Sequence, residues 1–352
     1  MRYFLPILFM TIVLAFLFAA NLYLSKRFAW YFSIEKKQIL YILFASVTVF
    51  MIAGLIIFTN INGIISSIIY GSAAVLMGFM LYLLISVLLV DALHFIIKLN
   101  PRIYGFAALA LAMSISIYGI INSYHVRVRS FSLESDKITE DIRIMHISDV
   151  HLGHLRGQGF LENIIEKTNR ENPDIIMITG DLFDGTANLN DNIFQTMKEF
   201  NAPVYFVEGN HDGYTGAEII KQKLRDNGVY VLENEIVNFG EIQIIGLNHM
   251  SADRSTRNFH ANNHKKTIEE VLSKMEIDHN KPCVLMHHSP EGLKYVSANN
   301  IELYLSGHTH GGQLFPVNCI AELMFPFNKG LHKEGESTIY VSTGVGNFGQ
   351  PK

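Results

Sequence analysis

The pattern of hydrophobic and polar positions divides the chain into two unlike parts. Residues 1–125 are almost continuously apolar, whereas residues 126–352 alternate short apolar runs with polar and charged stretches. A chain of 352 residues also exceeds one typical domain, so its length favours two units as well. We predict an all-α membrane domain over residues 1–125, a polar linker over 126–141 and an α/β domain over 142–352.

The apolar part is predicted to cross the membrane four times. A helix needs about 20 apolar residues to span a bilayer, and three uncharged runs are long enough: Tyr3–Ser25, Gln38–Val90 and Ile103–Tyr124. The middle run is far too long for one helix, and the polar sequence Thr59–Gly63 divides it. The expected spans lie near residues 4–24, 38–58, 64–90 and 103–122. The first run is longer than the core of a signal peptide, so we expect an uncleaved anchor.

The positive charges of the short loops predict an orientation. Lys and Arg are enriched in cytoplasmic loops, and here they follow the first and third spans: Lys26, Arg27, Lys36, Lys37, Lys98 and Arg102. Arg127 and Arg129, after the fourth span, argue weakly for the opposite orientation. We therefore expect a multi-pass protein of the cell membrane whose C-terminal domain lies outside the cytoplasm. Asp91 and His94, at the end of the third span, are expected to reach the membrane interface.

The polar part has the pattern of a layered α/β domain. Short β-rich runs alternate in it with amphipathic stretches. Strands are expected at Arg143–Ser148, Ile175–Thr179, Val204–Val207, Ile242–Gly246, Cys283–His287, Leu303–Ser306 and Thr338–Ser342. Helices are expected over residues 159–170, 190–200, 215–227 and 266–276.

Most of these strands are followed by a cluster of Asp, Asn or His residues. The clusters are Asp149-Val150-His151, Gly180-Asp181, Gly209-Asn210-His211-Asp212, His287-His288-Ser289-Pro290 and Gly307-His308-Thr309-His310. Ligands of α/β sheets bind beyond the carboxyl ends of the strands, so five strands that deliver such side chains to one edge would assemble a single site. The glycines before Asp181, Asn210 and His308 permit sharp turns there.

These residue types indicate a site for two divalent cations. Carboxylate, imidazole and amide ligands suit borderline ions such as Mn²⁺, Zn²⁺ or Fe. Two such ions can deprotonate a bridging water and offset charge on the attacking and leaving oxygens of a phosphoester. A carboxylate that bridges both ions must come from a central position, and Asp181 is the natural candidate. Burial of so many imidazoles and carboxylates without a metal would be costly.

The order of these motifs resembles the calcineurin-like metallophosphoesterase family. Its pattern of D-x-H, G-D-x-x-D, G-N-H-D/E, a His near a strand end and G-H-x-H appears complete and in order between Asp149 and His310. Within that family, the runs Gly307–Gln313 and Ser342–Gly346 resemble the bacterial membrane-associated phosphohydrolase branch. The resemblance covers about residues 142–348 and implies a β-sandwich flanked by helices.

The resemblance also implies a role for each matching residue. The first metal would be held by Asp149, His151, Asp181 and His310. The second metal would be held by Asp181, Asn210, His308 and a histidine of the 287–288 pair. The family's H-x-P pattern favours His288 over His287 as that ligand. His211 would protonate the leaving alkoxide, and Asp212 would orient the ring of His211.

Other polar residues have weaker expectations. His154 and Arg156 follow the first ligand pair closely, and contact with a substrate phosphate or a solvated loop would suit them equally. Asp184 completes G-D-x-x-D and is expected to brace its loop. The polar stretch Asn248–Lys266, which contains His249, His260 and His264, is expected to be an exposed loop. Cys283 and Cys319 are expected to be buried thiols, with mutual pairing as the alternative.

The expected function is that of a membrane-anchored, dinuclear-metal-dependent phosphoesterase. It would hydrolyse a phosphomonoester or phosphodiester through a metal-bridging hydroxide, and the membrane tether suggests a lipid- or envelope-linked substrate. The alternative is a catalytically silent metal-binding sensor or scaffold on a membrane anchor, which is disfavoured because no ligand of the pattern is lost. A net charge of −4 gives no basic field, so nucleic acid is not an expected partner.

Overall fold

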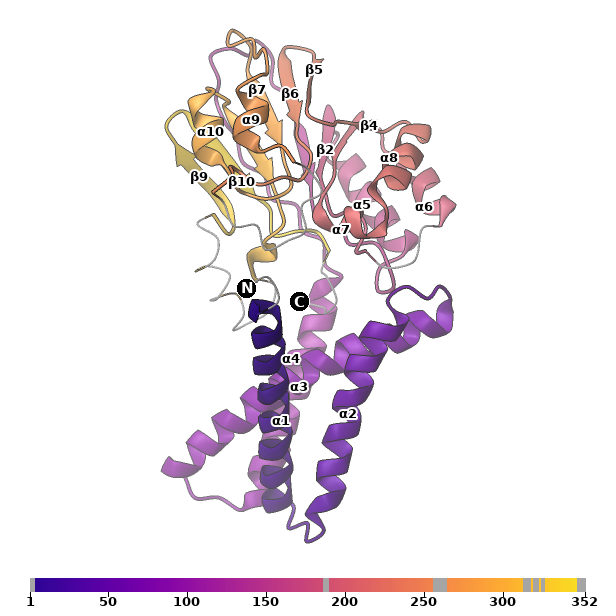
Figure 1. Cartoon of the computed structure of the whole chain (residues 1–352), viewed down its shortest axis with the longest axis vertical. Helices are drawn as coiled ribbons and strands as arrows, with labels where there is room; N and C mark the ends of the chain where they lie inside the picture. Colours follow the sequence, from indigo (N-terminus) through magenta and orange to yellow (C-terminus); the bar gives the residue numbers. More distant parts are fainter. Residues whose placement is uncertain are drawn as a thin grey trace. The chain divides into compact units, whose positions relative to one another are not determined.

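The structure is a computed structural model that describes residues 4–185, 190–255, 265–312, 318, 323 and 327–346. The chain divides into two compact units between Tyr124 and His125 (Figure 1). The first unit is entirely helical in its described part, and the second contains all the described strands. Each unit is described below by itself.

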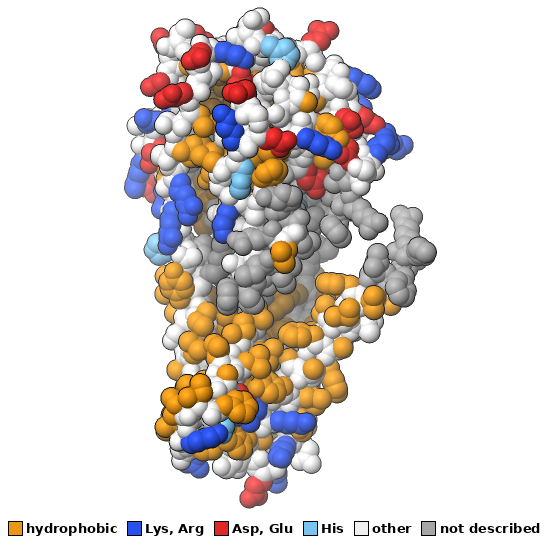
Figure 2. All heavy atoms as spheres, turned by 90° about the vertical axis from the view of Figure 1, so that its left-hand side faces the viewer, with side chains coloured by type: hydrophobic (Ala, Val, Ile, Leu, Met, Phe, Trp, Pro, Cys, Tyr) orange, Lys and Arg blue, Asp and Glu red, His pale blue; other side chains and the backbone are white. Residues whose placement is uncertain are grey.

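The first unit confirms the expected four spans. Its helices are α1 (Phe4–Tyr31), α2 (Lys37–Phe58), α3 (Ile64–Ile96) and α4 (Pro101–Ser123). All four are long and apolar enough to cross a membrane. Large apolar side chains cover the outside of these helices, whereas charged side chains cover much of the second unit (Figure 2). A water-exposed surface of this kind would be unfavourable, so the helices belong in a bilayer.

The ends of α1 and α3 extend beyond the spans expected from the sequence because their charges are paired. The Asp91 carboxylate on α3 forms an ion pair with Arg27 of α1. It also accepts hydrogen bonds from Tyr23 and Tyr31, the latter at 2.6 Å. The Arg27 guanidinium lies 4.3 Å from the ring centroid of Trp30. This cluster fastens α1 to α3, so Asp91 is a structural residue in addition to an interfacial one.

The second unit is built on two sheets. The first is fully parallel in the order β1-β2-β3-β4, and the second has the order β5-β6-β7-β8-β10-β9 with its two outer pairs antiparallel. The strands of the first sheet are β1 (Ile144–Ile147), β2 (Ile175–Thr179), β3 (Val204–Val207) and β4 (Tyr230–Val231). Those of the second are β5 (Glu235–Phe239), β6 (Ile242–Gly246), β7 (Cys283–Met286), β8 (Leu303–Ser306), β9 (Gly330–Glu334) and β10 (Ser337–Val341).

Alternation along the strands produces a four-layer sandwich. Side chains at successive strand positions point to opposite faces, so Ile175 and Met177 of β2 pack against the second sheet, together with Ile244 and Met286. Ile176 and Ile178 face the other way, into a core shared with helices α5, α6 and α8. The outer face of the second sheet packs on α9 and α10. The α/β sandwich flanked by helices, expected from the sequence, is therefore confirmed.

The helix expected over residues 159–170 is confirmed as α5, whereas the other three expected helices are shorter than predicted. The helices of this unit are α5 (Gln158–Arg170), α6 (Asp191–Thr196), α7 (Asn210–Thr215), α8 (Ala217–Asp226), α9 (Ile268–Leu272) and α10 (Leu293–Ala298). A helix was expected over 215–227, but Gly216 has a φ of 106° and separates α7 from α8. Since this left-handed conformation ends a helix, α7 forms a separate turn directly after β3.

Residues 126–141, expected to be a linker, instead pack on the second unit. The Lys167 ammonium donates a hydrogen bond to the Val126 carbonyl at 2.9 Å. The Thr139 hydroxyl donates one to Glu241 at 2.6 Å, and Ile138 joins the core between the sheets. These contacts leave few residues between the end of α4 and the beginning of the second unit.

Candidate metal centre

The predicted metal ligands lie in turns that follow five parallel strands. Asp149 and His151 follow β1, Asp181 follows β2, and Asn210 follows β3. His288 follows β7, and His308 and His310 follow β8. In each sheet the carboxyl ends of the parallel strands share one edge, and the two sheets pack on each other, so these residues meet although they are far apart in the sequence.

The backbone of this edge is unusually strained. Positive φ is found at nine described non-glycine residues, and five of these are predicted ligands: Asp149 (53°), His151 (52°), Asp181 (51°), His308 (73°) and His310 (51°). A non-glycine residue in a sparsely populated backbone region costs of order 1–3 kcal/mol and tends to occur at functional sites. The concentration of such residues here indicates that the strained backbone points the side chains of the predicted ligands into the site, at a cost in local stability.

Glycines allow the ligand-bearing turns to approach one another closely. Gly180 has a φ of 78°, and a Cβ there would lie 2.6 Å from the backbone nitrogen of Gly209. At Gly307 a Cβ would lie 2.1 Å from the Asp149 carboxylate. Any larger side chain would push these turns apart, so the glycines that precede Asp181 and His308 determine the width of the site.

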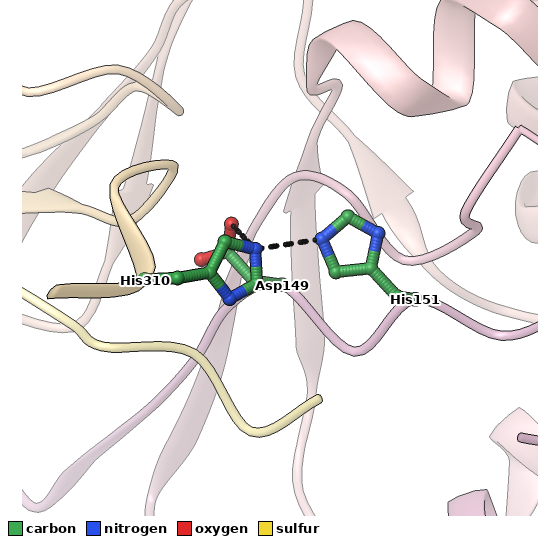
Figure 3. A group of neighbouring side chains, drawn as sticks. All are labelled: Asp149, His151 and His310. Atoms are coloured by element: carbon green, nitrogen blue, oxygen red, sulfur yellow. Dashed lines mark hydrogen bonds and ion pairs between the residues drawn. The ribbon is translucent and has the colours of Figure 1, made fainter. Parts of the chain in front are cut away.

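The first group of side chains contains Asp149, His151 and His310 (Figure 3). The Nε2 atoms of His151 and His310 are 2.9 Å apart, and His310 Nε2 lies 3.4 Å from Asp149 Oδ1. His151 Nε2 is also 3.7 Å from Asp181 Oδ2. Two imidazole nitrogens and two carboxylates thus converge on a small volume, which is the donor set expected for one divalent ion.

The second group contains Asp181, His288 and His308. His288 Nε2 lies 3.1 Å from Asp181 Oδ2, 3.2 Å from Asn210 Oδ1 and 3.1 Å from His308 Nδ1. Asp181 Oδ2 therefore faces both groups, as a bridging carboxylate must. The structure brings together every residue that was predicted from the sequence as a metal ligand.

The two histidines of the 287–288 pair have different surroundings. His288 faces the second group, and its Nδ1 is 2.8 Å from the Thr179 carbonyl. His287 is turned away, with Nδ1 2.7 Å from the Ser289 carbonyl, and its Nε2 accepts a hydrogen bond from Met250 N at 3.2 Å. Both rings are fully buried. Of the two, the geometry favours His288 as the metal ligand, and His287 supports the loop after β6.

The electrostatics of the buried groups suit a cation. Burial alone would raise the pKa of the Asp181 carboxyl, but the charge and hydrogen bond of His288, with His211 and His151, hold it well below its usual range. Burial raises the pKa of Asp149 to about 6. Burial lowers the pKa of His151 to about 3, so this ring is neutral at physiological pH. Burial alone would lower the pKa of His288, but the charge of Asp181 raises it to about 9, so a cation that binds there must displace the proton of this ring, whereas the ring of His151 is already neutral.

Comparison with known proteins agrees with the interpretation of these Asp and His residues as candidate metal ligands. The calcineurin-like phosphoesterase family matches residues 142–312. An uncharacterized metallophosphoesterase of Aquifex aeolicus is 32% identical over 252 residues, which cover 68% of this chain and 92% of that protein. The chain belongs to the calcineurin-like metallophosphoesterase family. Metallophosphoesterases of this family use a dinuclear metal site, and the described part of this chain has three overlapping groups of Asp and His that could hold a metal ion, the third being His151, Asp181 and His211.

Two further relatives are longer than the matched region. An uncharacterized metallophosphoesterase of Helicobacter pylori is 30% identical over 236 residues, covering 64% of this chain and 60% of the relative. A transmembrane protein with metallophosphoesterase domain from Danio rerio is 30% identical over 261 residues, covering 69% of this chain and 58% of that protein. The matched region thus spans about 60% of the length of these two relatives.

The structure corrects the role predicted for Asp212 in this metallophosphoesterase. Its buried carboxylate accepts hydrogen bonds from the backbone nitrogens of Asp181 (2.8 Å), Phe183 (3.0 Å) and Gly209 (2.8 Å). The ring of His211 is instead oriented by the Asp184 carbonyl, 2.9 Å from Nδ1. Asp212 therefore holds the turns after β2 and β3 together, because three backbone donors use the oxygens that were expected to orient His211.

Several other polar residues of this metallophosphoesterase differ from expectation. Arg156 is buried, with its guanidinium 4.7 Å from the ring centroid of Phe160, rather than in a solvated loop, and His154 is half-buried. His249 is also buried, with its ring centroid 5.6 Å from that of His288. The sequence did not predict the burial of His249, because Asn248 and His249 lie in a polar stretch.

Some expectations fall outside the part of the chain that the structure describes. These concern His260, His264 and Cys319. Cys283 is described and is a buried free thiol, as expected. Burial raises the pKa of this thiol to about 12, so it is unreactive at neutral pH.

Proposed function

We propose that this chain is a membrane-anchored hydrolase of phosphomonoesters or phosphodiesters that depends on two divalent metals. The observation that supports this most strongly is the position of Asp181 Oδ2, which lies within 3.7 Å of His151 Nε2 and 3.1 Å of His288 Nε2. One carboxylate oxygen between two imidazole groups suits a pair of ions. We assign the first metal to Asp149, His151, Asp181 and His310. We assign the second metal to Asp181, Asn210, His288 and His308.

The protein's own residues would position and protonate the substrate. Two bound divalent ions would lower the pKa of a water molecule and offset charge on the phosphoryl oxygens. His211 is the proposed general acid, because its backbone nitrogen donates to Asp181 Oδ1 at 2.8 Å and its ring lies 4.9 Å from that of His151. The Asp184 carbonyl at 2.9 Å from Nδ1 keeps the ring in one orientation. His211 would thus give a proton to the leaving oxygen as the ester bond breaks.

The membrane helices suggest the class of substrate. The second unit begins almost directly after α4, since Val126 already belongs to it. A phosphoesterase domain that follows a spanning helix after so short a stretch of chain favours a phosphoester carried by a lipid or by the cell envelope. Four such helices and the transmembrane relative make this a membrane protein. We further propose, from the loop charges, that the metallophosphoesterase domain lies outside the cytoplasm.

The test is metal-dependent hydrolysis by the full chain in detergent. After treatment with a chelator, Mn²⁺, Zn²⁺ or Fe²⁺ is added back and cleavage of bis-p-nitrophenyl phosphate is measured. On an alkyl phosphodiester, whose leaving alkoxide needs a proton, His211→Gln should lower kcat by about 10²- to 10⁴-fold without changing the metal content, and the loss should be smaller on the nitrophenyl ester, whose leaving group needs none. The exposed His279 provides a matched control, since His279→Gln should leave both quantities unchanged.

The same measurements distinguish the alternative functions. Two bound metals without hydrolysis of any phosphoester would favour a silent sensor or scaffold and contradict the proposal. For the substrate class, headgroup-bearing lipid phosphoesters are compared with soluble nucleotides. If only the nucleotides are cleaved, with equal efficiency after detergent extraction, a lipid substrate is wrong.

A further inference from the structure

Tyr214 is an exposed aromatic residue directly beside the proposed general acid. Its ring centroid lies 5.2 Å from that of His211, at an interplanar angle of 73°. The two residues are three positions apart on α7, and residues at this spacing share one face of a helix. The side chain of Tyr214 is nevertheless 52% exposed. The helix that carries Asn210 and His211 therefore also presents an aromatic ring to solvent.

The backbone around Tyr214 is fixed although its ring is exposed. Gly185 has a φ of 85°, and a Cβ there would lie only 3.1 Å from Tyr214 Cβ. The same glycine follows Asp184, whose carbonyl lies against the ring of His211. Gly216, with a φ of 106°, ends α7 two residues later. The short helix α7 thus holds the rings of His211 and Tyr214 in a defined orientation relative to each other.

The position of a general acid determines where the leaving group lies. In hydrolysis, water adds to phosphorus, the bond from phosphorus to the leaving oxygen breaks, and that oxygen takes up a proton. If His211 supplies this proton, the leaving oxygen must come within hydrogen-bond distance of its ring. The atoms attached to that oxygen then extend into the space next to His211, and the ring of Tyr214 borders that of His211.

We propose that Tyr214 contacts the leaving group and favours phosphoesters whose leaving alcohol carries an aromatic ring. This inference rests on the proposed function, because it uses His211 as the acid. Aromatic rings pack against one another in offset or edge-to-face arrangements, which adds to the gain from burying apolar area. A small hydrated alcohol such as glycerol has no such surface. Tyr214 would therefore determine which substrates are preferred, whereas His211 would protonate the leaving group of every substrate.

The experiment compares phosphodiesters that differ in the leaving alcohol. The full chain in detergent is assayed with an aryl, an octyl and a glyceryl leaving group on a common methyl phosphate. For each substrate kcat/KM of Tyr214→Ser is divided by that of the wild type, so the intrinsic reactivity of the substrate cancels. We expect the ratio to fall about fivefold for the aryl ester and less than twofold for the glyceryl ester. Tyr214→Phe should retain the preference.

Tyr230 provides the matched control. It is 56% exposed on β4 and stacks on Tyr205 at 4.9 Å between ring centroids, so Tyr230→Ser should leave all three ratios near one. An equal loss for all three substrates would mean that Tyr214 only supports His211, and would overturn the inference while the proposed function stands. An equal loss for the octyl and aryl esters would show a general apolar contact and overturn the aromatic preference. No hydrolysis by the wild type would overturn both proposals.

Discussion

At the scale of single residues, Asp181 contacts both groups of candidate metal ligands and the proposed general acid. Oδ2 faces both ligand groups, and Oδ1 accepts a hydrogen bond from His211 N at 2.8 Å. Its backbone nitrogen donates to Asp212 Oδ2 at 2.8 Å, and its φ is 51°. Both oxygens and the backbone are therefore used, so the position of Asp181 couples the two proposed metals to the proposed acid.

The adjacent residues His287 and His288 should have separable roles. His288→Ala removes an imidazole nitrogen 3.1 Å from Asp181 Oδ2, so we expect one metal to be lost and kcat to fall roughly a hundredfold. His287→Ala leaves the Met250 N–H buried without its acceptor, which costs about 1–3 kcal/mol of stability. We expect that variant to keep two metals and to unfold at lower urea. Metal analysis and urea titration of both variants check this; loss of a metal from the His287 variant alone would contradict it.

His146 should make the stability of the domain depend on pH. Its Nε2 is 2.8 Å from Thr179 Oγ1, and burial lowers its pKa from 6.5 to about 3. The unfolded chain therefore binds a proton below pH 6.5 that the folded chain does not, and stability falls as the pH falls from 6.5 toward 3. At pH 5 this amounts to at most about 2 kcal/mol.

The His146 effect is measured as a difference between two proteins. His146→Gln cannot be protonated, so its urea midpoint should fall less between pH 7 and pH 5 than that of the wild type. The other buried histidines are present in both proteins and cancel in the comparison. Equal pH dependence of the two midpoints would show that the folded ring takes up the proton as readily as the unfolded one.

Sequence reasoning found residues with motif signals and missed those placed by tertiary structure. Asp149, His151 and His310 follow strands in recognisable clusters, and the structure brings them together. Asp212 was given the wrong role because the sequence does not show that three backbone nitrogens point at its carboxylate. His249 lies in a polar stretch that suggested exposure, yet the loop after β6 folds back against His287.

At the scale of elements, an ion cluster around the buried Lys221 connects α8 to the end of β3. The Lys221 ammonium, on a side chain that is 2% exposed, lies 3.0 Å from Glu208, 2.8 Å from Glu218 and 2.5 Å from Glu233. Glu208 is the last residue before the turn that carries Asn210. The cluster therefore helps to hold the backbone of Glu208 and Gly209, which lies against Gly180 at the end of β2.

Removal of Lys221 should destabilise the domain strongly. Lys221→Met leaves Glu208 buried without its cation, and loss of one partner of a buried pair costs about 3–5 kcal/mol. Lys223→Met is the control on the same helix, since Lys223 pairs with the exposed Asp191 and should contribute less than about 1 kcal/mol. Urea titration of both variants checks this. A similar small loss in the two variants would show that Glu208 is solvated in the folded protein.

The elements recognised from the sequence are those with strong apolar patterns. β2, β3 and β6 are buried at every position, and their bounds agree with the prediction. β5 and β9 were missed because they are outer strands of the second sheet with mixed polar sequences. α10 was missed because six residues give too short a pattern to show helical periodicity.

At the scale of the whole molecule, a unit with an apolar surface and a unit with a charged surface are joined by very few residues. Apolar side chains cover the helices of the first unit, and the second carries the groups of Asp and His that could hold metal ions. Residues 126–141 pack on the second unit, so the connection from α4 is short. The change in composition falls where the structure divides into two units, between Tyr124 and His125, whereas the packing of residues 126–141 is visible only in the contacts of Val126 and Thr139.

The sidedness of the membrane can be tested with single cysteines. In a chain whose Cys283 and Cys319 are replaced by Ser, Glu35→Cys marks the loop between α1 and α2, and Arg170→Cys marks the exposed end of α5. If the positive loops face the cytoplasm, a membrane-impermeant maleimide should label Arg170→Cys in intact cells and Glu35→Cys only after permeabilisation. Loss of the Arg170–Glu166 ion pair should be harmless, because both side chains are more than half exposed. The reverse labelling pattern would place the metallophosphoesterase domain in the cytoplasm, where an envelope phosphoester could not reach it.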